Sequence, residues 1–113
     1  MIEINKQLIS ELLDKAEVNP RLRMNFDLRT SPDDGGQRML NALMPGTVVP
    51  IHRHPMSNES VICLSGKLVE IIYEEEEIAN DFAGAWHTVE VLEPSVIFEA
   101  KDGKYGEDGS ETI

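Results

Sequence analysis

The first segment of the chain has the polar and apolar pattern of an amphipathic helix. Apolar residues recur there at spacings of three and four, which places them on one helical face. These residues are Leu8, Ile9, Leu12, Leu13 and Ala16. Asn5 stands at a typical N-cap position, and Pro20 disfavours a helical conformation at Asn19. We therefore predict a helix from about Asn5 to Val18, packed on the outside of a sheet or on a partner subunit.

After Pro20 the pattern changes to short alternating segments separated by Gly and Pro turns, which is typical of strands. The expected strands are 23–29, 37–43, 47–51, 59–64, 67–73, 86–92 and 96–101. Two hairpins are expected, one around Ser65-Gly66 and one around Glu93-Pro94. Many short strands with such turns indicate a mainly β protein, either a sandwich or a barrel.

Composition narrows the class of protein further. The chain of 113 residues is 41% hydrophobic, which suits one globular domain. Its single cysteine excludes an internal disulfide. The net charge of −11 opposes binding to nucleic acid and to anionic membranes. No apolar run is long enough to span a bilayer, and the N-terminus lacks the pattern of a signal peptide, so we expect a cytoplasmic protein.

The residues with the clearest chemistry are three histidines and one glutamate. His52 and His54 are two residues apart, Glu59 follows five residues later, and His87 stands after Trp86. In extended strands, residues two apart face the same side, so His52 and His54 share a face. Glu59 shares its face with Val61 and Cys63, and His87 shares its face with Val89 and Val91.

A carboxylate on an apolar face is costly unless it is paired, and a bound cation would remove that cost. Neutral imidazoles with one carboxylate suit iron, manganese, nickel, cobalt or zinc. We therefore predict one divalent transition metal ion bound by His52, His54, Glu59 and His87. Taken singly, each of these residues has a structural interpretation, and histidines that only form hydrogen bonds within the barrel remain an alternative.

The same residues carry a resemblance to a known superfamily. The pattern Gly-x5-His-x-His-x4-Glu-x6-Gly, from Gly46 to Gly66, resembles the first cupin motif, and Gly84-x2-His87 resembles the core of the second. More narrowly, several stretches are similar to the WbuC family of small cupin-fold metalloproteins. These stretches are 20–25, 40–46, 52–55, 86–88 and 98–105.

The resemblance implies a cupin jelly-roll barrel (a double-stranded β-helix) of about six to eight strands, with one N-terminal helix. It also implies a homodimer, and a metal in the barrel mouth held by the three histidines and the glutamate. WbuC-like proteins are associated with bacterial surface-polysaccharide gene clusters. We therefore expect a small-molecule ligand at the barrel mouth that is related to sugars or polysaccharide biosynthesis, but no particular reaction.

The second motif departs from the cupin pattern. Glu76, Phe82 and Val91 stand where that motif has glycine, proline and asparagine. The stretch between Gly66 and Gly84 is also too short for the cupin pattern, which needs a further strand and turn after Tyr73 and before Trp86. Either the barrel is reduced there or residues are missing between Glu74 and Gly84, and we favour the second explanation because an unpaired edge beside a metal site is a liability.

These observations predict three parts: residues 1–19 as a helix on the barrel, 20–101 as the cupin barrel and 102–113 as an acidic, Gly-rich tail. Two classes of function follow. One is a metal-dependent enzyme acting on a small molecule, and the other is a non-catalytic module, a sensor or accessory protein, that binds a metal or small ligand. Arg21, Arg23 and Arg38 could provide positive charge at the barrel mouth for an anionic ligand, although solvated surface arginines are more common.

Overall fold

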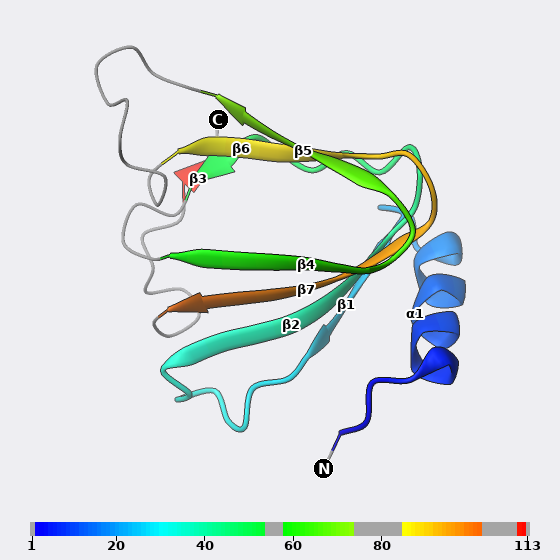
Figure 1. The fold of residues 1–113 in the computed structure, drawn as a ribbon, viewed down its shortest axis with the longest axis horizontal. Coiled ribbons are helices and arrows are strands. Elements are labelled where there is room, and N and C mark those ends of the chain that lie inside the picture. Colours follow the sequence, from blue (N-terminus) through cyan, green and yellow to red (C-terminus); the bar gives the residue numbers. More distant parts are fainter. Residues whose placement is uncertain (1, 54–57, 74–84, 103–110, 113) are drawn as a thin grey trace.

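The protein is mainly β, with one helix and two antiparallel sheets (Figure 1). The computed structural model describes residues 2–53, 58–73, 85–102 and 111–112. Its helix is α1 (Lys6–Val18). The strands of these residues are β1 (Arg23–Asp27), β2 (Gly36–Leu43), β3 (His52–Arg53), β4 (Glu59–Ser65), β5 (Leu68–Tyr73), β6 (Trp86–Val91), β7 (Ser95–Asp102) and β8 (Glu111–Thr112).

The helix begins and ends where the sequence predicts. The Asn5 side chain accepts a hydrogen bond of 2.9 Å from the Leu8 backbone N–H, which satisfies a donor that the first helical turn cannot pair. Asn19 is extended, with φ −76° and ψ 135°, as expected before Pro20. None of the helices in the described ranges is both long and apolar enough to cross a membrane.

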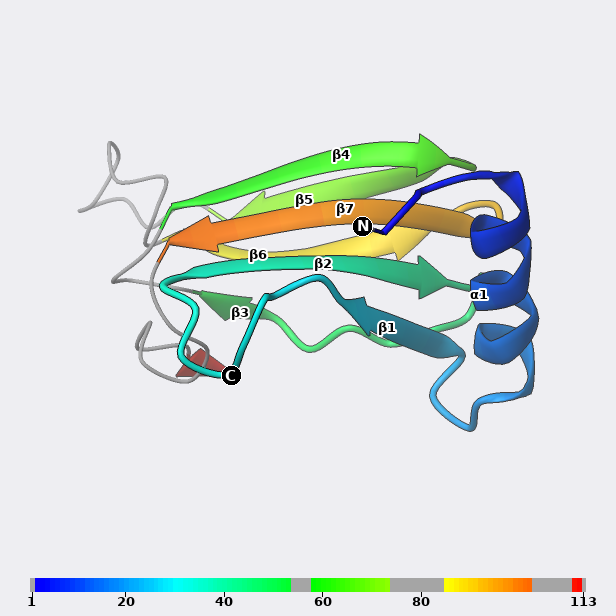
Figure 2. The ribbon, with the colours of Figure 1, turned by 90° about the horizontal axis from the view of Figure 1, so that it is seen from below.

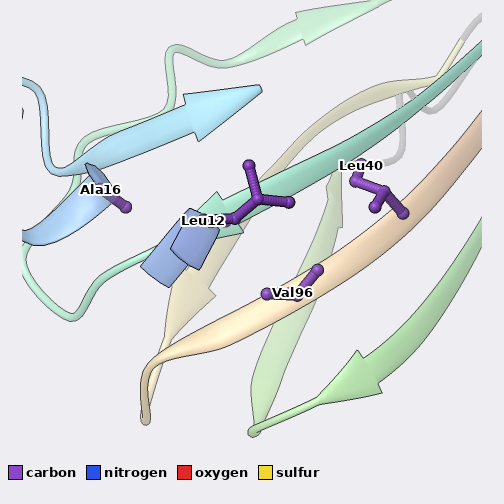
Figure 3. Close-up of a cluster of buried hydrophobic side chains, with 5 residues drawn as sticks. Leu12, Ala16, Leu40 and Val96 are labelled. Carbon is purple, nitrogen blue, oxygen red and sulfur yellow. The ribbon is translucent and has the colours of Figure 1, made fainter. Parts of the chain in front are cut away.

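The first sheet, called sheet A, has the strand order β1-β2-β7-β4. The helix covers its outer face (Figure 2). Leu12 and Ala16 of α1 are buried there against alternate residues of β2 and β7, and Figure 3 shows this cluster. The strand residues of the cluster are Leu40, Ala42 and Val96. The prediction that the helix packs on the outside of a sheet is therefore confirmed.

The second sheet, called sheet B, has the order β5-β6-β3-β8 and faces the inner side of sheet A (Figure 1). A second apolar cluster joins the two sheets, with Leu43 from β2, Ile97 from β7 and Val91 from β6 at its centre. Leu43 and Val91 are the last residues of β2 and β6, and Ile97 is the third residue of β7. Burying them stabilises the fold by roughly 1.5–3 kcal/mol for each side chain.

The two predicted hairpins are wrong. Strands β4 and β5 follow each other in sequence, but β4 pairs with β7 and β5 pairs with β6. In the same way, β6 belongs to sheet B and β7 to sheet A. The turn residues are where the sequence places them, but each connection carries the chain from one sheet to the other, which a local pattern does not reveal.

These two connections pack against each other. The Lys67 N–H donates to the Ser95 hydroxyl at 3.0 Å, and that hydroxyl donates to the Glu93 carbonyl at 2.7 Å. The backbone N–H groups of Leu92 and Glu93 also donate to the Lys67 carbonyl. The contacts hold the two sheets in a fixed relation at the end of the sandwich near α1.

The structure also differs from the sequence prediction on both sides of β3. The expected strand at 47–51 is absent, and this extended segment is followed by the two-residue strand β3. Residues 111–112, which we predicted to lie in the tail, form β8 and pair with β3. The question of missing residues between Glu74 and Gly84 falls on residues outside the described part of the chain.

Candidate functional site

A cavity of about 460 Å³ lies between the two sheets. This volume is within the range typical of small-molecule sites. On β2, β4 and β7 of sheet A its wall is formed by alternate residues, because every second side chain of a strand points inward. The sheet A residues that line it are Arg23, Met24, Asn25, Met39, Asn41, Leu43, Glu59, Val61, Ile97, Glu99 and Lys101. Sheet B contributes His52, Glu70, His87, Val89, Glu111 and Thr112.

His52 and His87 lie side by side on the wall formed by sheet B. They are direct partners in the pairing of β3 with β6, and their ring centroids are 4.2 Å apart. Each Nδ1 contacts a backbone carbonyl two residues earlier, His52 that of Pro50 at 2.7 Å and His87 that of Ala85 at 2.9 Å. A carbonyl oxygen only accepts, so Nδ1 donates in both contacts.

This pair of hydrogen bonds fixes the chemistry of the two rings. With the proton on Nδ1, the lone pair of a neutral imidazole lies on Nε2. Metal-binding histidines use the same arrangement, in which a carbonyl or carboxylate holds the other ring nitrogen and orients the ring. His52 and His87 are therefore prepared to bind a metal through Nε2.

Glu59 approaches His87 from the opposite sheet. It is the first residue of β4 and pairs with Lys101 of β7. Its Oε2 atom lies 3.8 Å from His87 Nε2, and both atoms are buried. This separation exceeds a hydrogen bond. Two donors that share one ion at about 2.1 Å are roughly 3.0–3.5 Å apart, so a movement of a few tenths of an ångström would let both bind one ion.

The structure brings three of the four predicted ligands to the cavity wall, namely His52, Glu59 and His87. The fourth, His54, lies outside the described residues. Among the residues that are described, no group of three or more His, Cys, Asp or Glu side chains forms a cluster that could hold a metal ion. The donor types and the orientation of both imidazoles still fit a divalent transition metal.

Sequence reasoning missed two polar residues that line the cavity, Asn41 and Glu99. Glu99 of β7 accepts a hydrogen bond of 3.1 Å from the Asn41 side chain of β2. Both residues lie on the inner face of sheet A, as does Lys101. The signal that could have revealed them is a polar residue at an inward position of a strand. Asn41 stands between Leu40 and Ala42, which are buried against α1 on the other face of β2. Glu99 stands two residues after Ile97, on the same face of β7.

The arginines divide into two groups. Arg53 forms an ion pair of 2.7 Å with Glu111, and the two side chains are 27% and 48% exposed. The Arg53 guanidinium also lies 4.5 Å from the centre of the Trp86 ring. Arg38 pairs with Asp34 and does not line the cavity. Arg21 and Arg23 do line the cavity.

The fold and the site together define a mainly β protein with a polar cavity between two sheets. The chain belongs to the family described as "Domain of unknown function (DUF6016)", which it matches over residues 4–82. The match includes α1, His52 and Glu59, and it ends before His87. Comparison with curated proteins and with solved structures found no match.

Proposed function

We propose that this protein is a small cupin-type metalloprotein that acts as a metal-dependent enzyme on a small molecule. In this proposal, His52, His54, Glu59 and His87 bind one divalent transition metal, and the cavity beside them binds the substrate. The observation that carries the proposal is that His52, His87 and Glu59, from three strands and both sheets, lie at the same end of the cavity.

The order of the strands supports the cupin part of the proposal. Strands β2, β3, β4 and β5 lie alternately in sheets A and B, and β6 and β7 again lie in different sheets. This repeated crossing between two antiparallel sheets is typical of a jelly roll. Residues 74–84, where the sequence is shorter than the cupin pattern, lie outside the described residues.

Two glycines of the first cupin motif also have the backbone conformation that requires glycine. Gly46 has φ 92° and Gly66 has φ 88°, both in the left-handed region that other residues rarely adopt. The motif therefore corresponds to real constraints of the chain at both of its ends. This agreement supports the resemblance of the segment from Gly46 to Gly66 to the cupin motif.

The polar residues beside the ligands support catalysis. A bound divalent ion would act as a Lewis acid or redox centre for a substrate oxygen. The chain itself would orient that substrate through the Glu99 carboxylate, which Asn41 holds in place, and through Lys101. The resemblance to WbuC points to a sugar or a polysaccharide precursor as the substrate class.

Metal analysis of protein purified without a nickel column tests the proposal. We expect about one equivalent of metal per chain, because the predicted ligands form one site. His52→Ala, His87→Ala and Glu59→Gln are each expected to lower the metal content sharply. Loss of even an outer hydrogen-bond partner of a ligand changes metal affinity by about 10- to 100-fold, and loss of a ligand should exceed that.

The matched control is Glu90→Gln. Glu90 lies on the same strand as His87, but it is exposed and points to the opposite face. Its substitution removes one carboxylate without touching the cavity, so the metal content should equal that of the unmodified protein. Metal retained in all three ligand variants would refute the proposal.

A further inference from the structure

The end of the cavity near the C-terminus of α1 differs in charge from the end that carries the predicted ligands. Arg21 and Arg23 line it together with the polar side chains of Asn19 and Asn25. At the other end the lining includes Glu59, and this is where the two histidines lie. The cavity is therefore cationic at one end and prepared for a cation at the other.

The two ends are well separated. Arg23 pairs with Leu43 of β2, whereas Glu59 pairs with Lys101, which in turn pairs with Gln37 of β2. Gln37 and Leu43 are six positions apart on one strand, which corresponds to about 20 Å along the sheet. A group bound by the arginines therefore occupies a different part of the cavity from a group bound at the histidines.

Arg21 and Arg23 are unusual among the five arginines of the chain. The other three each have a carboxylate partner: Arg29 pairs with Asp27, and Arg38 and Arg53 pair as described above. Within the described part of the chain, neither Arg21 nor Arg23 forms an ion pair. In a chain of net charge −11, two neighbouring arginines without an acidic partner are unexpected.

Electrostatics disfavour this arrangement in the absence of an anion. Burial lowers the pKa of Arg23, and the positive charge of the neighbouring Arg21 lowers that pKa further. Both effects oppose the charged form of Arg23. An anion placed between the two guanidinium groups would reverse the second effect and supply a partner for both.

The backbone between the two arginines is also held in a costly conformation. Leu22 has φ 56°, in the left-handed region that a branched side chain rarely adopts. Three hydrogen bonds maintain it: Leu22 N–H to the Asn19 carbonyl, Met44 N–H to the Leu22 carbonyl, and the Thr47 hydroxyl to the Arg21 carbonyl. These bonds fix the positions from which both arginines reach the cavity.

We propose that Arg21 and Arg23 form an anion-binding subsite of the cavity, which holds a phosphate or carboxylate group of its ligand. Guanidinium groups bind both kinds of anion through paired N–H donors. The ligand is then an elongated organic anion, whose charged group lies near α1 and whose other end extends toward His52 and His87. Only this last statement rests on the proposed function, because the subsite itself requires no metal.

Titration of the full-length protein, treated with a chelator, tests the subsite independently of the metal. The probes are inorganic phosphate and succinate at low ionic strength, and the readouts are calorimetry and backbone amide NMR. We expect at least one probe to bind and to shift the amide signals of residues 21–23. Arg21→Gln and Arg23→Gln should each weaken binding by about 10- to 100-fold, the effect of losing a hydrogen bond to a charged group.

Arg38→Gln is the matched control, because it removes the same charge from an arginine that already has a partner. It should leave the affinity for the probe within about twofold. His52→Ala is the second control, since it removes a predicted metal ligand at the distant end and should also leave the affinity unchanged. Arg21 is exposed, so Arg21→Gln provides a readout even where Arg23→Gln impairs folding.

The proposal is overturned where neither anion binds, or where Arg38→Gln weakens binding as much as Arg21→Gln does. It is also overturned where His52→Ala abolishes binding, because the anion would then occupy the histidine end. Tighter binding of phosphate than of succinate would identify a phosphorylated ligand, and the reverse order would identify a carboxylic acid. A failure of the metal analysis would not change any of these results.

Discussion

At the scale of single residues, Gly66 shows why a motif position can depend on distant parts of the chain. Its φ of 88° disfavours any side chain, and an added Cβ would clash with the Pro94 carbonyl oxygen. Pro94 belongs to the other connection between the sheets, which is 28 residues away in sequence, as the bond from Lys67 to Ser95 shows. The sequence motif predicts a glycine here, but only the structure gives the reason.

Substitutions at three glycines should therefore have graded effects on stability. We expect Gly66→Ala to lower the free energy of unfolding by more than about 2 kcal/mol, since strain and a backbone clash combine. Gly46→Ala should cost only about 1–2 kcal/mol, because φ is 92° but the nearest atom is 3.6 Å away. Gly35→Ala, with nothing within 4 Å, is the control and should change stability by less than about 1 kcal/mol. Denaturant unfolding measures all three, and equal losses would contradict this explanation.

Asp34 gives a prediction for the dependence of stability on pH. Backbone N–H groups of Gly36 and Thr30, and then the Arg38 side chain, lower the pKa of Asp34 far below its usual value of 3.8. A lowered pKa in the folded state adds stability above the unfolded-state pKa, and this contribution is lost as the pH falls. Asp34→Asn should thus be less stable than the unmodified protein at pH 7.

The difference between these two proteins should begin to decrease below about pH 4, where Asp34 of the unfolded chain gains its proton. Urea unfolding curves recorded from pH 7 down to pH 2.5 measure it. A difference that stays constant over this range would show that Asp34 contributes through its shape and not through its charge.

At the scale of elements, the helix was the easiest part to predict. Its apolar spacing, its Asn5 cap and Pro20 are all local signals, and the structure confirms each of them. The strands were harder, because pairing depends on residues far apart in sequence. Local turn signals located the connections at Gly66 and Pro94 but could not show that the chain changes sheets there.

The contact between α1 and sheet A should contribute strongly to stability. Leu12 is 2% exposed and packs against β2 and β7, so Leu12→Ala should lower the free energy of unfolding by about 2–5 kcal/mol. Val18 on the same helix is 82% exposed, and Val18→Ala should change it by less than about 0.5 kcal/mol. Denaturant unfolding of both variants tests this. Similar values for the two would mean that α1 does not pack on sheet A in solution.

The candidate site was predictable only in part. Alternation along each strand correctly placed His87 with Val89, and Glu59 with Val61, on the cavity side. The hydrogen bonds that orient the two imidazoles arise from the backbone before each strand, which no pattern of residue types encodes. Glu99 was missed because a charged residue in a strand ordinarily indicates a solvated face.

At the scale of the whole molecule, charge is distributed unevenly. The chain carries a net charge of −11, yet its cavity includes two arginines without carboxylate partners in the described residues. A negative surface slows the approach of anions, so an anionic ligand depends on this local positive charge. The homodimer implied by the cupin resemblance stays a prediction. Light scattering of the purified protein would decide between a mass near 12.7 kDa and twice that value.

The central claim is that His52, His54, Glu59 and His87 bind one transition metal ion inside the cavity. The most direct measurement is a crystal structure of the metal-loaded protein with anomalous data collected at the absorption edge of the bound metal. We predict one anomalous peak per chain, within about 2.0–2.2 Å of Nε2 of His52 and His87 and of the Glu59 carboxylate. A peak elsewhere in the molecule, or none after metal loading, would contradict the account.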